Sequence, residues 1–177
     1  MHPNTLAAAG AAVLLFLACT SAGAAAAPAP APAPDLTPPL GATLVREVQA
    51  GGAQVYACRA AAEGAYQWTL TGPKALLVND DGSDFGIHGA GPSWTAADGS
   101  SIRADGAHPL AVVKVTGAVP ALLLKVVAST GSGALSGVQF VRRADTEGGL
   151  PPVTGCDAAH TGATIAVHYS AVYTFFR

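Results

Sequence analysis

Charged side chains are scarce in this sequence of 177 residues. Lysine and arginine together number 9, aspartate and glutamate 11, and the formal net charge is −2. A protein that holds a nucleic-acid backbone needs a basic patch to neutralise the phosphates, and the sequence contains none. We therefore expect no nucleic-acid partner. Because charged residues make up only 11% of the chain, small residues such as alanine, glycine, serine and threonine must cover much of the surface.

The sequence also lacks an apolar run of transmembrane length at its start. The stretch from Leu6 to Ala18 is apolar, but it is shorter than the ~20 residues that a membrane-spanning helix needs. Small residues follow at 22–26, which is the layout of a secretory signal peptide, although no lysine or arginine precedes the run. We predict a signal peptide over residues 1–26 and export to the periplasm, the extracellular space or the outer envelope.

Two ways of removing the signal peptide stay open. Residues 16–19, Phe-Leu-Ala-Cys, resemble a bacterial lipobox, in which Cys19 would carry a lipid anchor. Cleavage at an Ala-x-Ala site within residues 22–26 would instead release a soluble protein. Residues 27–41 begin with alternating alanine and proline, which favours a polyproline II spacer of roughly 40 Å, although a disordered leader fits equally well. The rest, residues 42–177, has the size of a single domain.

Cysteine is also rare, with 3 residues in the chain. Once Cys19 is assigned to the signal region, Cys58 and Cys156 have only one way to pair within the chain. A disulfide bond is the expected state of such a pair in an oxidising compartment. The bond would hold the start of the domain beside its end. Two buried free thiols are the alternative.

No segment after residue 43 shows a helical stripe of apolar residues, whereas strand-like segments are frequent. The clearest covers residues 163–176, where Tyr169, Tyr173 and Phe175 share one face of a strict alternation. Other segments are bounded by glycine, proline or Asp-Gly turn signals: 53–60, 66–71, 74–79, 110–116, 121–129 and 135–143. The sequence therefore predicts an all-β domain, built as an antiparallel β-sandwich or barrel.

Several motifs carry a family resemblance. The most specific is His-x-Ala-Gly-Pro-x-Trp followed by Asp-Gly-Ser, which begins at His88 and ends at Ser100. Together with GAQVYACR, VPALLL, VQFVRRADTEGGLPPVTGCD and YSAVYTFF, it resembles the domain of unknown function 3455 family from about residue 38 to the C-terminus. The resemblance implies an exported protein of a bacterial and fungal family without an established function, so it suggests a fold and little chemistry.

Some fungal members of that family carry a malate dehydrogenase label, which the residues of this sequence argue against. A dinucleotide-binding glycine loop must open a helix whose N-terminus receives the pyrophosphate. The nearest candidate, residues 131–136, is followed by the strand-like residues 137–141, so a hairpin turn explains its glycines better. We reject a dehydrogenase function and expect no cofactor.

The stretch GIHGAGPSW, residues 86–94, is the strongest candidate for a site. Its glycines permit an open groove, His88 has a side chain that titrates near neutral pH, and Trp94 could form an apolar or sugar-stacking wall. A catalytic histidine needs a partner, and the nearby loops offer three carboxylates: Asp84, Asp98 and Asp105. The alternative is a tight bend in which Trp94 is a core anchor and His88 hydrogen-bonds a backbone carbonyl.

Metal binding has less support. Four histidines, His88, His108, His160 and His168, are dispersed without the spacing of metal ligands. Residues 79–84, Asn-Asp-Asp-Gly-Ser-Asp, fit a hairpin turn better than a calcium loop because no bidentate glutamate follows at the required distance. We expect no metal site.

The sequence thus favours an exported, non-catalytic module with a binding or structural role in the cell envelope or extracellular space. Its ligand is unknown, and His88 and Trp94 are the candidate binding residues. Two alternatives stay open: an extracellular hydrolase that pairs His88 with Asp84 or Asp98, and a purely structural envelope protein. Membrane contact is expected only through the candidate lipid anchor at Cys19.

Overall fold

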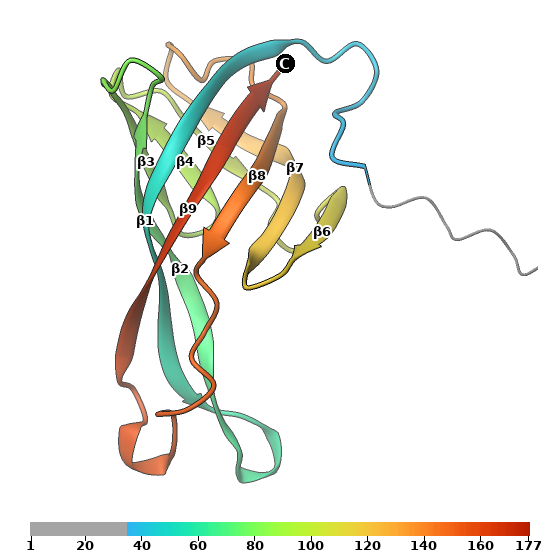
Figure 1. Cartoon of the computed structure of the whole chain (residues 1–177). Coiled ribbons are helices and arrows are strands. Elements are labelled where there is room, and N and C mark those ends of the chain that lie inside the picture. Colours follow the sequence, from blue (N-terminus) through green and yellow to red (C-terminus); the bar gives the residue numbers. More distant parts are fainter. Residues whose placement is uncertain (1–34) are drawn as a thin grey trace, which may run out of the picture. The chain divides into compact units, whose positions relative to one another are not determined.

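Long stretches of alternating apolar and polar residues form paired strands in the computed structural model, which describes residues 35–177 (Figure 1). The predicted signal peptide, Cys19 and the first part of the predicted spacer lie outside the described residues. The elements are β1 (Leu44–Ala60), η1 (Ala62–Gly64), β2 (Tyr66–Val78), β3 (Asp84–Gly89), β4 (Ser93–Ala96), β5 (Ser101–Ala104), β6 (Ala111–Val115), β7 (Ala118–Thr130), β8 (Phe140–Gly148), η2 (Ala158–His160) and β9 (Thr164–Phe176). The all-β prediction is confirmed. Within this part of the chain, no helix is long and apolar enough to cross a membrane.

All the strands pair antiparallel and belong to one sheet, in the order β5-β4-β3-β2-β1-β9-β8-β7-β6. β5 pairs with β7 as well, from Ser101 opposite Thr130 to Ala104 opposite Val126. This pairing closes every strand except β6 into a barrel, and β6 joins the outside of the ring through β7. Of the two architectures that the sequence allowed, the domain adopts the barrel.

Inward-facing side chains of alternate positions pack the barrel interior. In β9, the aromatic residues Tyr169, Tyr173 and Phe175 are at most 1% exposed, as the alternation of the sequence predicted. Each such burial contributes about 1.5–3 kcal/mol to folding. Large apolar residues of other strands complete this core: Val48, Leu77, Phe85, Trp94, Ile102, Leu124 and Val141.

One end of the barrel is closed by the connection between β7 and β8, residues 131–139, which we call the plug loop. Leu135 and Val138 of this loop are 0% and 3% exposed and belong to the core. The predicted strand 135–143 therefore begins later, at Phe140. The apolar residues that suggested an early start of the strand are used to cover the end of the barrel.

At the opposite end, β1, β2 and β9 continue past the other strands as a twisted arm (Figure 1). The arm starts at a β-bulge between Val55 and Tyr56 of β1, opposite Gly72 of β2. Gly72 has a φ of +143°, and a Cβ atom there would lie 2.5 Å from the Cβ of Ala90. Only glycine fits this crossing of β2 and the turn between β3 and β4.

The predicted disulfide bond between Cys58 and Cys156 is present. Cys58 lies in the arm portion of β1 and is 1% exposed. Cys156 belongs to the connection between β8 and β9, 98 residues later in the chain. The bond therefore ties the arm to a segment that has no regular strand pairing of its own.

Candidate functional site

Residues 86–94, which the sequence singled out, form a β-hairpin made of β3, a tight turn and β4. His88 lies directly opposite Trp94 across the hairpin, so both side chains face the same side of the sheet. Their rings stack with centroids 4.6 Å apart and an interplanar angle of 12°. Trp94 is fully buried and His88 is 3% exposed. The tryptophan is therefore part of the core, and it does not line an open groove.

The imidazole of His88 is neutral and held in one orientation. Its Nδ1 lies 2.8 Å from the carbonyl oxygen of Ser93. Because a carbonyl only accepts hydrogen bonds, Nδ1 carries the proton and Nε2 is the basic nitrogen. Burial, with a smaller effect from the charge of Arg143, lowers the pKa of His88 to about 4, although the Ser93 hydrogen bond opposes this shift.

Buried polar groups of aromatic residues lie near this ring. Among the described residues, the indole Nε1 of Trp94 is buried without a hydrogen-bond partner, whereas the buried hydroxyls of Tyr169 and Tyr173 interact with each other and the Tyr173 hydroxyl with Arg143. The Tyr173 ring centroid is 4.9 Å from that of His88. Burial raises the pKa of both tyrosines, so their hydroxyls stay protonated and can donate hydrogen bonds. Since nearly all buried polar groups in proteins have a partner, the indole N–H of Trp94 is the group near His88 that stands out as lacking one.

Arg143 of β8 brings a positive charge to the same region. It lies opposite Tyr173 of β9 and therefore shares its inward face. The Nε and Nη2 atoms of Arg143 donate to the carbonyl oxygen of Pro120 at 3.0 and 2.8 Å. Its charge counteracts the rise in the pKa of Tyr169 and Tyr173. The guanidinium thus acts on a cluster of groups that carries no negative charge at neutral pH.

The neighbouring Arg142 has different surroundings, because consecutive residues of a strand face opposite sides. Its Nη2 lies 3.6 Å from the carboxylate of Glu47 and donates to Thr174 Oγ1 at 3.1 Å. Its guanidinium also lies over the ring of Phe176, 5.5 Å from the centroid. Arg143, by contrast, forms no ion pair with a carboxylate of the described residues. Glu47 therefore balances the charge of Arg142, whereas no carboxylate of the described residues balances that of Arg143.

A pocket of about 260 Å³ reaches these side chains at the arm end of the barrel. We call it the inner pocket; its polar wall includes Gln54, His88 and Arg143, and its apolar wall includes Pro73 and Leu122. Gln54 is 2% exposed. Its amide takes part in none of the side-chain hydrogen bonds formed within residues 35–177 and faces the pocket. The inner pocket therefore offers hydrogen-bonding groups that the protein itself leaves free.

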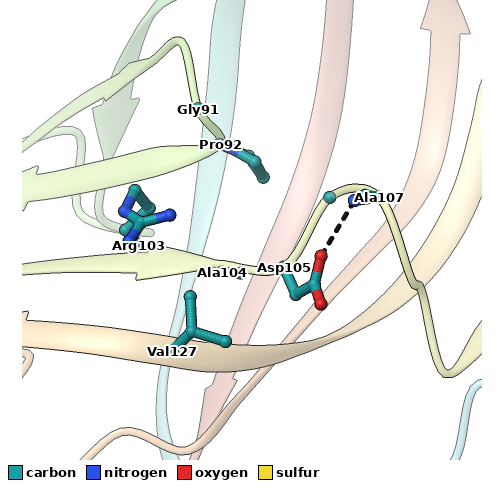
Figure 2. A pocket seen from close by; sticks show the side chains of 8 residues that line it. Gly91, Pro92, Arg103, Ala104, Asp105, Ala107 and Val127 are labelled. Carbon is teal, nitrogen blue, oxygen red and sulfur yellow. Dashed lines mark hydrogen bonds between the residues drawn. The ribbon is translucent and has the colours of Figure 1, made fainter.

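A larger and more open depression of about 590 Å³ adjoins the inner pocket (Figure 2). The two hollows share Gly91, Pro92 and Gly106. A Cβ atom on Gly106 would lie 2.8 Å from the Cδ of Pro92, so these two residues pack closely and form the common wall. In the depression, Asp105 accepts a hydrogen bond from the Ala107 N–H at 3.0 Å, while Arg103 lines another side (Figure 2). The depression therefore carries charges of both signs, and its carboxylate, Asp105, is already hydrogen-bonded within a loop.

The structure does not bring the three candidate carboxylates to His88, whose Nδ1 is bound to a backbone carbonyl. Asp84 is exposed and begins β3, at the end of that strand remote from His88. Asp98 accepts a hydrogen bond from the N–H of Ala134 at 2.7 Å and so holds the plug loop. Asp105 is used in the loop after β5. Asp98 and Asp105 are thus hydrogen-bonded to backbone N–H groups of loops, and Asp84 lies at the other end of β3 from His88.

The other histidines of residues 35–177 do not line the inner pocket. The Nδ1 atom of His108 lies 3.0 Å from Oδ2 of Asp105. The Nδ1 atom of His160 lies 2.7 Å from Oδ1 of Asp157. His168 is exposed on the arm portion of β9. Across residues 35–177, no three histidine, cysteine, aspartate or glutamate side chains gather closely enough to hold a metal ion.

Neither Gln54 nor Arg143 was predicted from the sequence as a site residue, although the alternation of its strand bears on each. Val48 and Ala50 alternate inward along β1, and Gln54 continues that alternation as a polar residue in a core position. Two consecutive arginines in a strand must face opposite sides, so one of them had to point inward. What the sequence could not give is that both residues meet His88 in one pocket.

The family model described as "Protein of unknown function (DUF3455)" matches residues 39–177. The match covers the whole barrel and the arm. No curated protein matches the chain. No solved structure matches it either.

Proposed function

The chain belongs to the DUF3455 family of proteins of unknown function, and we propose that it is an exported, non-catalytic binding module whose ligand site is the inner pocket. The observation that carries this proposal is the polar wall of that pocket. Gln54, His88 and Arg143 meet there inside a barrel that is otherwise packed with apolar side chains. Ligand sites typically combine an apolar hollow with a few fixed polar groups.

The surroundings of His88 favour binding over hydrolysis. A histidine that activates a nucleophile is usually oriented by a carboxylate on its second nitrogen. Here the carbonyl of Ser93 occupies Nδ1, and stacking on Trp94 holds the ring in the core. The low pKa of His88, about 4, keeps it neutral at physiological pH. It then serves as a fixed wall of the pocket with one free acceptor nitrogen.

Export is supported by the disulfide bond and by the N-terminal sequence. Disulfides persist in oxidising compartments and are rare in the cytosol, and the Cys58–Cys156 bond ties the arm to the connection between β8 and β9. The apolar N-terminal stretch and the small residues after it fit a signal peptide. An exported module with a buried ligand site would take up a small molecule from outside the cytoplasm.

The binding function is tested by protein-observed NMR with a library of small molecules of differing charge. We expect at least one compound to shift the side-chain amide signals of Gln54 and the ring signals of His88. Leu122→Phe, which enlarges a side chain of the pocket wall, should abolish these shifts. Leu44→Phe is the matched control, because Leu44 is 62% exposed at the start of β1, away from the inner pocket.

Two results would contradict the proposal. In the first, no compound of any charge class shifts these signals, which would favour a purely structural envelope protein. In the second, compounds bind equally to the wild type and to a folded Leu122→Phe variant, which would place binding elsewhere on the protein. A cooperative thermal melt of each variant establishes that it is folded before its binding is measured.

A further inference from the structure

We propose that the inner pocket binds small organic carboxylates, whose carboxyl group pairs with the guanidinium of Arg143. This inference rests on the proposed binding function and names the class of ligand. The polar wall around Arg143 would hold the acid group, and the apolar wall would take the carbon chain.

The charge of Arg143 is unbalanced. Arg143 is partly buried, and among the residues of 35–177 that line the pocket there is no carboxylate and Arg143 alone is charged at neutral pH. Its neighbour Arg142 has Glu47 beside it. A charge removed from bulk water without a partner is costly. An anion that enters the pocket would supply the partner that Arg142 already has.

Donors of Arg143 remain for a ligand. A guanidinium binds a carboxylate well because several N–H groups lie in one plane. Arg143 donates from Nε and Nη2 to the carbonyl of Pro120 and also interacts with the Tyr173 hydroxyl, and with five N–H groups it keeps donors for an added anion. The amide of Gln54 lines the same pocket and is also free. A carboxylate has two oxygens, and these two donor groups can serve one each.

The size and the apolar wall of the pocket also favour a small organic acid. Its volume of about 260 Å³ falls below the ~300–1,000 Å³ of pockets for drug-sized ligands. Leu70, Pro73, Pro92 and Leu122 form its apolar side. Because His88 is neutral, Arg143 provides a single positive charge, which matches a monoanion better than a phosphate dianion. These features suit a short organic acid with an apolar body.

The test compares acids with their neutral counterparts on the oxidised wild-type protein. Butyrate and benzoate are titrated by NMR alongside butyramide and benzamide, which have nearly the same shape and no charge. We expect each acid to bind at least about tenfold more tightly than its amide, the difference that a charge-assisted hydrogen bond supplies. Inorganic phosphate is titrated as a second anion and should bind more weakly than the acids.

Substitutions then locate the charge that matters. Arg143→Gln should remove the preference for acids over amides. Gln54→Glu adds a carboxylate inside the pocket with little change of shape, so it should compete with the acids and weaken their binding by at least about tenfold. Arg142→Gln is the matched control, because it changes the net charge equally but lies on the opposite face of β8. It should leave the binding of acids unchanged.

The outcomes separate this inference from the binding function itself. If amides or other neutral compounds occupy the pocket as tightly as acids, the carboxylate inference is overturned while the binding function stands. Phosphate that binds more tightly than both acids would likewise overturn it. If none of the probes and no library compound binds, both proposals fail. Should Arg143→Gln not fold, the comparison of acids with amides on the wild type and the Gln54→Glu variant still decides the question.

Discussion

At the scale of single residues, the interior of the barrel is organised around Trp94. Its ring stacks on His88 and meets the rings of Tyr173 and Phe175 edge-on, with centroids 5.5 and 6.2 Å away. Such aromatic pairs contribute ~0.5–1.5 kcal/mol beyond the burial of their surface. The tryptophan thus joins the hairpin of β3 and β4 to β9 on the other side of the barrel.

Trp94→Ala should lower the free energy of unfolding by about 3–5 kcal/mol, the range for emptying a buried aromatic site. Thermal and urea unfolding monitored by far-UV circular dichroism would measure the loss. Trp68→Ala is the matched control, because Trp68 lies in the arm, is only partly buried and donates its Nε1–H to the Thr154 carbonyl. A Trp94→Ala variant that unfolds at the same midpoint as the Trp68→Ala variant would refute the central role of Trp94.

The buried imidazole of His88 makes stability depend on pH. Its pKa is about 4 in the folded protein against 6.5 for an ordinary histidine, so the unfolded chain binds a proton more readily. The folded state therefore keeps its full stability above pH 6.5 and loses stability as the pH falls from 6.5 to 4. At ~1.4 kcal/mol for each pH unit, we expect a loss of about 3 kcal/mol across this window.

His88→Gln supplies the comparison for this pH effect. Glutamine cannot titrate, so between pH 6.5 and 4 the variant should lose about 3 kcal/mol less stability than the wild type. Near neutral pH the variant should be the less stable protein by ~1–3 kcal/mol, because the Ser93 carbonyl loses a buried donor. Urea unfolding at several pH values measures both effects. Parallel pH profiles of the two proteins would show that His88 does not titrate abnormally.

At the scale of the elements, the plug loop shows how apolar residues outside a strand can finish a core. Leu135 is fully buried although it lies in a turn. Its N–H donates to Ser100 Oγ at 3.1 Å, which fixes the loop on the turn between β4 and β5. The loop therefore behaves as part of the barrel, and the core depends on its position.

Leu135→Ala should destabilise the protein by about 2–5 kcal/mol, because it leaves a cavity at the closed end of the barrel. Leu150→Ala removes the same atoms from a side chain that is 44% exposed and should cost less than about 1 kcal/mol. Unfolding curves of the two variants give the difference directly. Equal stabilities would mean that the plug loop is dispensable for the core.

The sequence predicted the all-β class and the face of β9 because alternation over a long strand leaves a clear period. It failed where local and tertiary effects compete. Leu135 and Val138 suggested an early start of the strand, yet they cover the barrel end instead. Residues 86–94 contain three glycines and a proline, and the tight bend considered for them is present as the turn of a hairpin, with Trp94 buried and His88 bonded to the Ser93 carbonyl. The sequence did not show that the residues on either side of this turn pair as strands.

The candidate site was predicted only in part for the same reason. His88 could be recognised as a candidate because glycines, a proline and a tryptophan surround it within residues 86–94. Gln54 and Arg143 lie far from it in the chain and come together only when β1, β3 and β8 join one barrel. Alternation indicated that Gln54 faces inward and that one of Arg142 and Arg143 does, but the pocket that Gln54 and Arg143 share depends on the closure of the sheet.

At the scale of the whole molecule, the disulfide bond and the core occupy separate regions. The bond joins Cys58 to Cys156 at the arm, while the buried core cluster lies within the barrel and includes neither cysteine. Because the bond closes a loop of 98 residues, it restricts the unfolded chain strongly. The bond thus stabilises the barrel by restricting the unfolded chain, although neither cysteine belongs to the core cluster.

Replacing both cysteines, Cys58→Ser with Cys156→Ser, should lower the free energy of unfolding by about 2–4 kcal/mol and leave the barrel folded. The cause is the larger conformational entropy of the unbridged unfolded chain, for which a loop of this length sets an upper bound of ~4.7 kcal/mol. Guanidinium unfolding measures the change, and the near-UV circular dichroism of the buried aromatic cluster reports whether the core persists. Reductant should bring the wild type to the stability of the double variant and leave the variant unaffected. If reductant destabilises both proteins equally, its effect does not act through this disulfide bond. If the double variant unfolds at the same midpoint as the wild type, the bond does not stabilise the barrel.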